Sequence, residues 1–372
     1  RVTGDKDFIE RIFDTEEKNR NENLFDVAMT FCDELIAVFS DCTIEDEYGL
    51  NNLTKAYFRK GDALKIICHY DEALIYFIKS GEIDKKLVEA YPENPTYLRG
   101  YSVSLEGLAG VYKAQNKLKE ALKLYNESLA ISKKLAEAYP ENPDYLSDYS
   151  ISLEKVADVY KAQNKLEEAV KLYNEDLAIS KKLADDYPDN SDYLRGYSIS
   201  LVNVTDVYKV QNKLEEALSL YNEALAIWKR IAELYPENPT YLRGYSISLE
   251  RVADVYKAQN KLTEALSLYN ETLAISKKLA DDYPDNPDYL RGYSVLLERV
   301  AGIYELQNKL KEALSLYNEA LAIKKKLADA YPENPDYLDG YSISLGRVAG
   351  IYEKQNKLEE ALSLYNEALA IW

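Results

Sequence analysis

Residues 142–188 read NPDYLSDYSISLEKVADVYKAQNKLEEAVKLYNEDLAISKKLADDYP, and this stretch decides the fold. Closely similar stretches precede and follow it, because the dipeptide Tyr-Pro recurs in constant steps of 48 residues. The tyrosines of this dipeptide are Tyr91, Tyr139, Tyr187, Tyr235, Tyr283 and Tyr331. Such strict spacing predicts one structural unit repeated along the chain, rather than two or three ordinary globular domains.

Each repeat is expected to hold two amphipathic helices, because its apolar residues fall at helical spacing. In the first full repeat they are Leu105, Leu108, Val111 and Tyr112, then Leu118, Ala121, Leu122, Leu124, Tyr125 and Leu129. Asn142-Pro143-Asp144 supplies a helix start, and Gln115-Asn116-Lys117 a tight turn in which Asn adopts the left-handed conformation. The second helix should end at Tyr139-Pro140. Each helix is then about 20 residues, or about 30 Å, long.

The repeats divide the 372 residues into three parts. Residues 1–48 match the pattern loosely and are expected to form a degenerate helical cap over the first repeat, as terminal repeats commonly do. Residues 49–96 form a divergent first repeat in the same register. Residues 97–372 contain five full repeats and one incomplete repeat, which starts at Tyr337 and stops at Trp372.

The packing residues resemble the signature of the tetratricopeptide repeat family. The first helix carries Leu105, Leu108, Ala109 and Tyr112, and the second carries Ala121, Tyr125 and Ser128. The resemblance implies an all-α fold, a right-handed solenoid of antiparallel helix pairs, and binding of other proteins. Three features depart from the family: a period of 48 residues instead of 34, Asn116 in place of the turn glycine, and a second helix that continues through Lys133.

Composition narrows the classes of partner and the cellular compartment. The net charge of −18 opposes binding to nucleic acid and to anionic membranes and favours a basic or neutral protein or peptide. No apolar run reaches the length of about 20 residues that crosses a bilayer. Three cysteines are too few for a disulfide framework, so a cytoplasmic location is expected. Because the sequence starts at Arg1 instead of Met, a leader peptide that has been removed remains an alternative.

In the family, the first helix of each pair lines the concave surface, and the resemblance places a variable, largely acidic stripe there. The candidate partner-binding residues are Glu106, Glu154, Lys155, Asp158, Asn203, Asp206, Glu250, Arg251, Asp254, Glu298, Arg299 and Arg347. The stripe could receive a basic or polar peptide. It could equally be a solvated face with ion pairs along one helix, since Lys155 and Lys161 flank Asp158, and Arg251 and Lys257 flank Asp254.

The remaining residues point away from catalysis, cofactors and metal ions. The only histidine, His69, has no nucleophile or base that the sequence places beside it, and phosphate-binding glycine loops and calcium loops are absent. The tyrosines at fixed positions, and the glycines at the position of Gly100, are expected to serve packing.

Two functions follow from these patterns. The first is a scaffold that binds a partner on the acidic concave face of residues 97–288. The second is a structural subunit that assembles end to end into filaments, because a last repeat that breaks off at Trp372 leaves an apolar flank uncapped.

Overall fold

The computed structural model describes residues 6–21, 24–43 and 46–371, and the regular elements in these ranges are helices. Arg1 and Trp372, the two ends of the chain to which predictions refer, lie outside the described residues. The chain forms two compact units, Arg1–Ser200 and Leu201–Trp372, and the helix α9 runs through the point of division.

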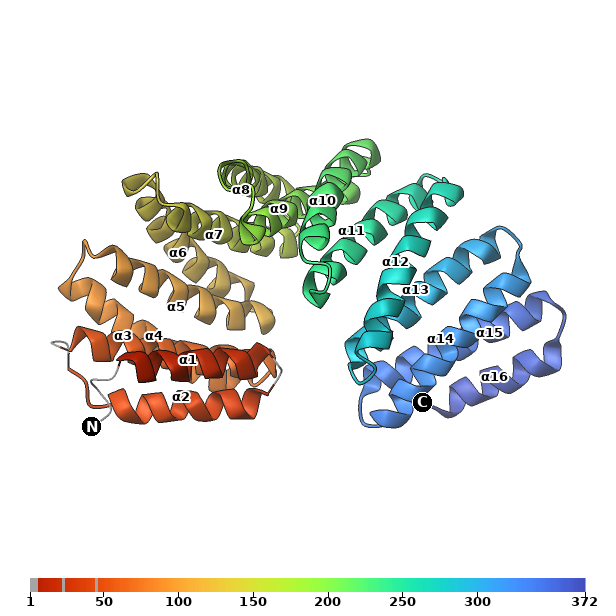
Figure 1. Ribbon diagram of the computed structural model, residues 1–372, viewed down its shortest axis with the longest axis horizontal. Helices are drawn as coiled ribbons and strands as arrows, with labels where there is room; N and C mark the ends of the chain where they lie inside the picture. The colour runs from red at the N-terminus through yellow and green to blue at the C-terminus, as the bar shows by residue number, and fades with distance from the viewer. Residues whose placement is uncertain (1–5, 22–23, 44–45, 372) are drawn as a thin grey trace. The chain divides into compact units, whose positions relative to one another are not determined.

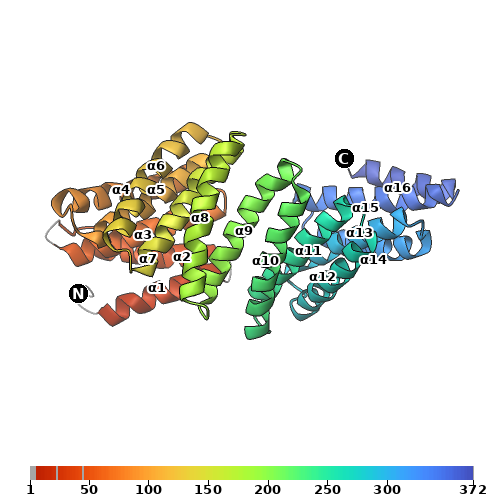
Figure 2. The same ribbon diagram turned by 90° about the horizontal axis from the view of Figure 1, so that it is seen from above.

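The N-terminal unit contains α1 (Lys6–Asn21), α2 (Phe25–Phe39), α3 (Glu47–Ile66), α4 (Tyr70–Ala90), α5 (Pro95–Ala114), α6 (Leu118–Ala138), α7 (Pro143–Ala162), α8 (Leu166–Asp186) and the first half of α9 (Ser191–Val210). The C-terminal unit contains the rest of α9, α10 (Leu214–Leu234), α11 (Pro239–Ala258), α12 (Leu262–Asp282), α13 (Pro287–Leu306), α14 (Leu310–Ala330), α15 (Pro335–Lys354) and α16 (Leu358–Ala370). Within each unit, consecutive helices lie side by side as antiparallel pairs (Figures 1 and 2). The predicted all-α fold of stacked helix pairs is confirmed. No helix in the described ranges is long and apolar enough to cross a membrane.

The predicted helix starts and turns are also confirmed. The Asn142 side chain accepts hydrogen bonds from the backbone amides of Asp144 and Tyr145, and Pro143 occupies the first turn of α7. Asn116 has a φ of 57°, the left-handed conformation that lets the chain reverse between α5 and α6. The same conformation recurs at Asn164, Asn212, Asn260, Asn308 and Asn356, and at Cys68 in the divergent repeat.

The core follows the predicted packing positions with two exceptions. Ala109 and Ala121 are fully buried where paired helices approach, and Tyr125 is 3% exposed between them and the next repeat. Tyr139, however, is 44% exposed, and its ring lies against Tyr145 at the surface. The glycines do not share one packing role either. A side chain at Gly244 would collide with Trp228, whereas one at Gly196 or Gly292 would meet open space.

The helices α1 and α2 lie against the divergent first repeat. Ile9 and Phe13 of α1 and Leu35 and Phe39 of α2 form one apolar cluster with α3. These two helices therefore bury the side of α3 that would otherwise face water. The limits of the predicted cap, residues 1–48, stay a prediction.

One buried carboxyl group, Asp176 on α8, conflicts with the apolar core around it. The residue is 2% exposed and accepts a hydrogen bond from Ser150. Its second oxygen has no hydrogen bond of ordinary geometry among the described residues. Burial raises the pKa of Asp176 to about 7, although Ser150 and Ser200 oppose that rise. Equivalent positions hold small residues that suit the site better: Ser80, Ser128, Ala224, Thr272 and Ala320.

We expect Asp176→Ser to stabilise the protein at pH 8 by about 1–3 kcal/mol, the cost of a buried polar group without a full set of partners. Because the pKa of Asp176 is raised in the folded state, protonation of its carboxyl group favours the folded state. This contribution to the free energy of unfolding is fully present below about pH 4 and is lost as the pH rises to about 7. The gain from the substitution should therefore shrink at pH 5. Urea unfolding at both pH values measures it, with the exposed Asp185→Ser as control. An equal gain at pH 5 and pH 8 would show that ionisation of Asp176 is not the cause.

Candidate functional site

The first helix of each repeat presents one face away from its core. On α5 this face carries Arg99, Val103, Glu106, Gly110 and Lys113, which are spaced three or four residues apart. Leu105 and Ala109 lie on the opposite, buried side. We call this surface the first-helix face, and every residue predicted to bind a partner belongs to it or borders it.

Exposed aliphatic residues at one recurring position of this face form an aliphatic stripe. It consists of Val103, Ile151 and Ile199 in the N-terminal unit and of Ile247, Val295 and Ile343 in the C-terminal unit. All are 38–47% exposed except the half-buried Val295. Hollows lie beside Val103 and Ile151, beside Ile247 and Val295, and beside Val295 and Ile343. Arg243 and Arg291 border the second of these hollows.

The predicted carboxylates form a second band on the first-helix face, and they are already paired between repeats. Asp206 accepts a hydrogen bond from Tyr221 of its own repeat at 2.5 Å and one from Arg251 of the next repeat at 2.9 Å. Asp254 is held in the same way by Tyr269 and by Arg299, 2.8 Å away. The second guanidinium nitrogen of Arg299 lies 2.9 Å from Glu250. We call this series of tyrosine–carboxylate–cation contacts the carboxylate ladder.

In the N-terminal unit, the ladder uses a cation from the preceding repeat. Asp158 accepts hydrogen bonds of 2.6 Å from Lys113 and from Tyr173. Burial raises the pKa of Asp158, but the bonds from Lys113 and Tyr173 outweigh it and leave the pKa below its usual value. Asp158 is therefore fully ionised at neutral pH.

In the last two repeats the ladder position is glycine, and a glutamate three residues later replaces the aspartate. Glu305 accepts hydrogen bonds from Tyr317 at 2.9 Å and from Lys354 at 2.5 Å, although its repeat has Gly302 at the usual position. In the last repeat, Glu353 accepts the hydroxyl of Tyr365. The tyrosine keeps a carboxylate in both repeats.

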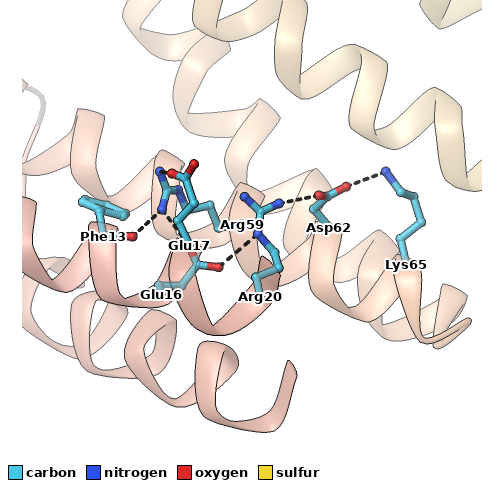
Figure 3. A network of polar contacts seen from close by, with 7 residues as sticks. All are labelled: Phe13, Glu16, Glu17, Arg20, Arg59, Asp62 and Lys65. Atoms are coloured by element: carbon cyan, nitrogen blue, oxygen red, sulfur yellow. Dashed lines mark hydrogen bonds and ion pairs between the residues drawn. The ribbon is translucent and has the colours of Figure 1, made fainter. Parts of the chain in front are cut away.

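The helix α1 supplies the first part of the ladder (Figure 3). Asp62 of the divergent repeat lies between Arg20 of α1, at 2.8 Å, and Lys65, at 2.6 Å. Arg59, at the position equivalent to Arg251, lies 2.6 Å from Glu16 of α1. The helix α1 thus provides the charges that a preceding repeat would provide.

The other residues predicted to bind a partner differ in their burial and in their contacts. Glu106 accepts hydrogen bonds from Ser128 and Ser152, and Glu298 is buried against Lys324, with Arg347 at 3.5 Å. Glu154 and Lys155 are half-buried, and the side-chain nitrogen of Asn203 is buried without a hydrogen-bond partner among the described residues.

The geometry corrects one expectation and adds one feature. The expected ion pairs along single helices do not hold Asp158 and Asp254, because Lys113 and Arg299 come from neighbouring repeats and Arg251 contacts Asp206. The aliphatic stripe was missed. Helical geometry could have found it, since Val103 lies about 160° around the helix from Leu105.

Comparisons with known proteins agree with this architecture. Sequence models of the tetratricopeptide repeat match residues 103–144, 152–187, 199–239 and 245–326. The chain belongs to the tetratricopeptide repeat family. No curated protein matches this tetratricopeptide repeat chain in sequence.

Among the solved structures that share its fold are the apo form of RapI and BtubC (BKLC) from P. vanneervenii. The apo form of RapI is 12% identical, with 98% of this chain and 97% of that chain covered and a TM-score of 0.60. BtubC (BKLC) from P. vanneervenii is 16% identical, with 68% and 90% covered and a TM-score of 0.54. At these identities the similarity concerns the fold alone.

We expect Arg299→Ala to destabilise the tetratricopeptide repeat stack by about 1 kcal/mol, because the substitution leaves two half-buried carboxylates without their cation. The control is Lys278→Ala, which removes an exposed pair with Glu237 at 3.7 Å and should cost less than about 0.5 kcal/mol. Urea unfolding measures both. Equal losses for the two variants would mean that the ladder adds no more than a surface ion pair.

Proposed function

We propose that this chain is a protein-binding scaffold whose first-helix face binds a peptide segment of a partner, without a catalytic step. The aliphatic stripe supports the proposal most directly. Ile247 and Ile343 are 42% and 47% exposed, so close to half of each apolar side chain faces water. Exposed apolar residues that recur in one place, next to hollows, are typical of surfaces that bind proteins.

In this proposal the apolar residues provide most of the affinity. The carboxylates predicted to attract the partner, Asp158, Asp206 and Asp254, already have cations within 3 Å, so their fields are largely compensated. The net charge of −18 still favours a basic or neutral partner at long range. The acidic residues therefore act mainly by raising the rate of association with such a partner and by making that rate depend on salt.

A random peptide library displayed on phage provides a partner for the test. Peptides are selected on the whole chain and then measured as synthetic peptides by isothermal titration calorimetry. We expect selected sequences to carry apolar residues. We expect an affinity that changes little between low and high salt if the stripe dominates, and that falls steeply with salt if the carboxylates dominate.

We expect the double variant Ile247→Ser with Ile343→Ser to weaken binding of peptides selected on the C-terminal unit more than tenfold, a loss above about 1.4 kcal/mol. The free energy of unfolding should fall by about 1–3 kcal/mol, because roughly half of each side chain is buried, and the variant should stay folded. The matched control is Leu234→Ser, which removes a residue 52% exposed at the end of the second helix α10. Unchanged affinity in the double variant, or an equal loss in the control, would contradict a binding role for the stripe.

The filament alternative has one observation in its favour. Leu358, Leu362 and Leu369 of α16 are 60–72% exposed, while the equivalent Leu310, Leu314 and Leu321 of α14 pack against the following repeat. This exposed face of α16 could dock a second copy of the chain.

Light scattering over a concentration series tests the alternative. If the chains assemble through α16, the mass should grow with concentration, and Leu362→Ser with Leu369→Ser should return it to that of a monomer. A monomer at every concentration would exclude assembly. Growth that the double variant does not change would exclude α16 as the joint.

A further inference from the structure

One position in the carboxylate ladder lacks its carboxylate. Tyr173, Tyr221 and Tyr269 each donate to an aspartate fifteen residues earlier, and Tyr317 and Tyr365 each donate to a glutamate twelve residues earlier. Tyr125 has Gly110 at the first of these positions and Lys113 at the second. Tyr125 therefore has neither the aspartate nor the glutamate that accepts the tyrosine hydroxyl in the other repeats.

The groups that would surround the missing carboxylate are present. Lys155 occupies the position of Arg251 and Arg299, which reach back to the aspartate of the preceding repeat, and the equivalent of that aspartate is Gly110. Within the described part of the chain, Lys155 forms no ion pair and the Tyr125 hydroxyl has no hydrogen-bond acceptor. A Cβ added at Gly110 would lie 3.6 Å from that hydroxyl, so a carboxylate starting there would be within reach.

The space at this position is open on the first-helix face. It is a hollow lined by Phe58, Val103, Gly107, Gly110, Tyr125 and Lys155, all within the N-terminal unit. Gly107 in its lining has no room for a side chain, because a Cβ there would lie 2.5 Å from the ring of the buried Phe77. Val103 belongs to the aliphatic stripe, so a peptide on the stripe passes this hollow.

The charges around the hollow favour an anion. Lys155 lies at its edge, and Lys65, which also lines it, is paired with Asp62. Glu106, the carboxylate in the lining, accepts hydrogen bonds from Ser128 and Ser152. Burial raises the pKa of Glu106, although the two serines and Lys155 oppose that rise. Burial and the negative charges of Glu106 and Asp158 raise the pKa of the Tyr125 hydroxyl, but Asp158 is paired with Lys113.

We propose that the hollow over Gly110 receives an aspartate or glutamate side chain of the bound partner, which accepts a hydrogen bond from Tyr125, pairs with Lys155 and completes the ladder. The inference rests on the proposed function, because it places this side chain on a peptide that lies along the first-helix face. It assigns one acidic residue to a partner segment that is otherwise apolar, basic or neutral.

The first test uses acetate, which carries the carboxylate without the peptide. A single 3-fluorotyrosine at position 125 reports on the hydroxyl by 19F NMR while sodium acetate replaces sodium chloride at constant ionic strength. We expect a saturable shift in the otherwise unchanged chain, a roughly tenfold weaker response in Lys155→Ala, and no response in Gly110→Asp, whose own carboxylate fills the hollow. A linear shift, or an equal shift in Gly110→Asp, would overturn the proposal.

A measurement of the melting temperature distinguishes a Gly110→Asp variant that fills the hollow from one that only perturbs the helix. Gly196→Asp is the matched control, because it also replaces a helical glycine in the N-terminal unit but has open space around it. We expect Gly110→Asp to raise the melting temperature more than Gly196→Asp does. A lower melting temperature for Gly110→Asp would contradict the completed contact with Tyr125 and Lys155.

The two proposals can fail separately. Saturable acetate binding together with selected peptides that ignore the aliphatic stripe would leave the carboxylate site and refute the proposed function. Peptides that need the stripe, together with an absent acetate response, would refute the carboxylate site alone.

Discussion

The structure depends on the tyrosine that the second helix of a repeat inserts against the next repeat. Tyr173, Tyr221 and Tyr269 are among the largest fully buried side chains, and the rings of Tyr221 and Tyr269 fill the space between a helix pair and the next first helix. A buried phenol must also satisfy its hydroxyl. The hydroxyl therefore fixes where a carboxylate lies on the first-helix face, and the carboxylate fixes where a cation from the adjoining repeat lies. One side chain thus connects the apolar core to the polar pattern on the surface.

Much of the fold was predictable because its determinants are local. The Asn142 cap, Pro143 and the left-handed Asn116 set the ends of the helices within a few residues of chain, and the apolar spacing set their buried sides. The partners of Asp158 and Asp254 were not predictable in this way. Lys113 is 45 residues from Asp158 in sequence, and a choice between it and the closer Lys155 depends on how neighbouring repeats pack. Sequence spacing along one helix does not contain that information.

The candidate surface was predictable in part. The first-helix face was identified through the family resemblance, and its charged positions were found because they vary. The aliphatic stripe was overlooked because Val103 and its equivalents stand in runs such as Ser-Ile-Ser-Leu, where an apolar residue is easily taken for core. Residues that hold the stack together and residues that are free to meet a partner thus alternate on the same helix. The charged positions can be recognised because their residues differ between repeats, whereas the aliphatic stripe can be recognised only from the exposed fraction of its side chains.

The most direct measurement of the central claim places the photo-crosslinking residue p-benzoylphenylalanine at position 247 and, in a second variant, at position 234. Both side chains are exposed, Leu234 more so than Ile247, but Leu234 lies on the second helix α10 and only Ile247 lies on the aliphatic stripe. With a peptide selected on the chain, we expect strong crosslinking from position 247 and little from position 234. Equal crosslinking from both positions, or stronger crosslinking from position 234, would contradict a binding role for the first-helix face.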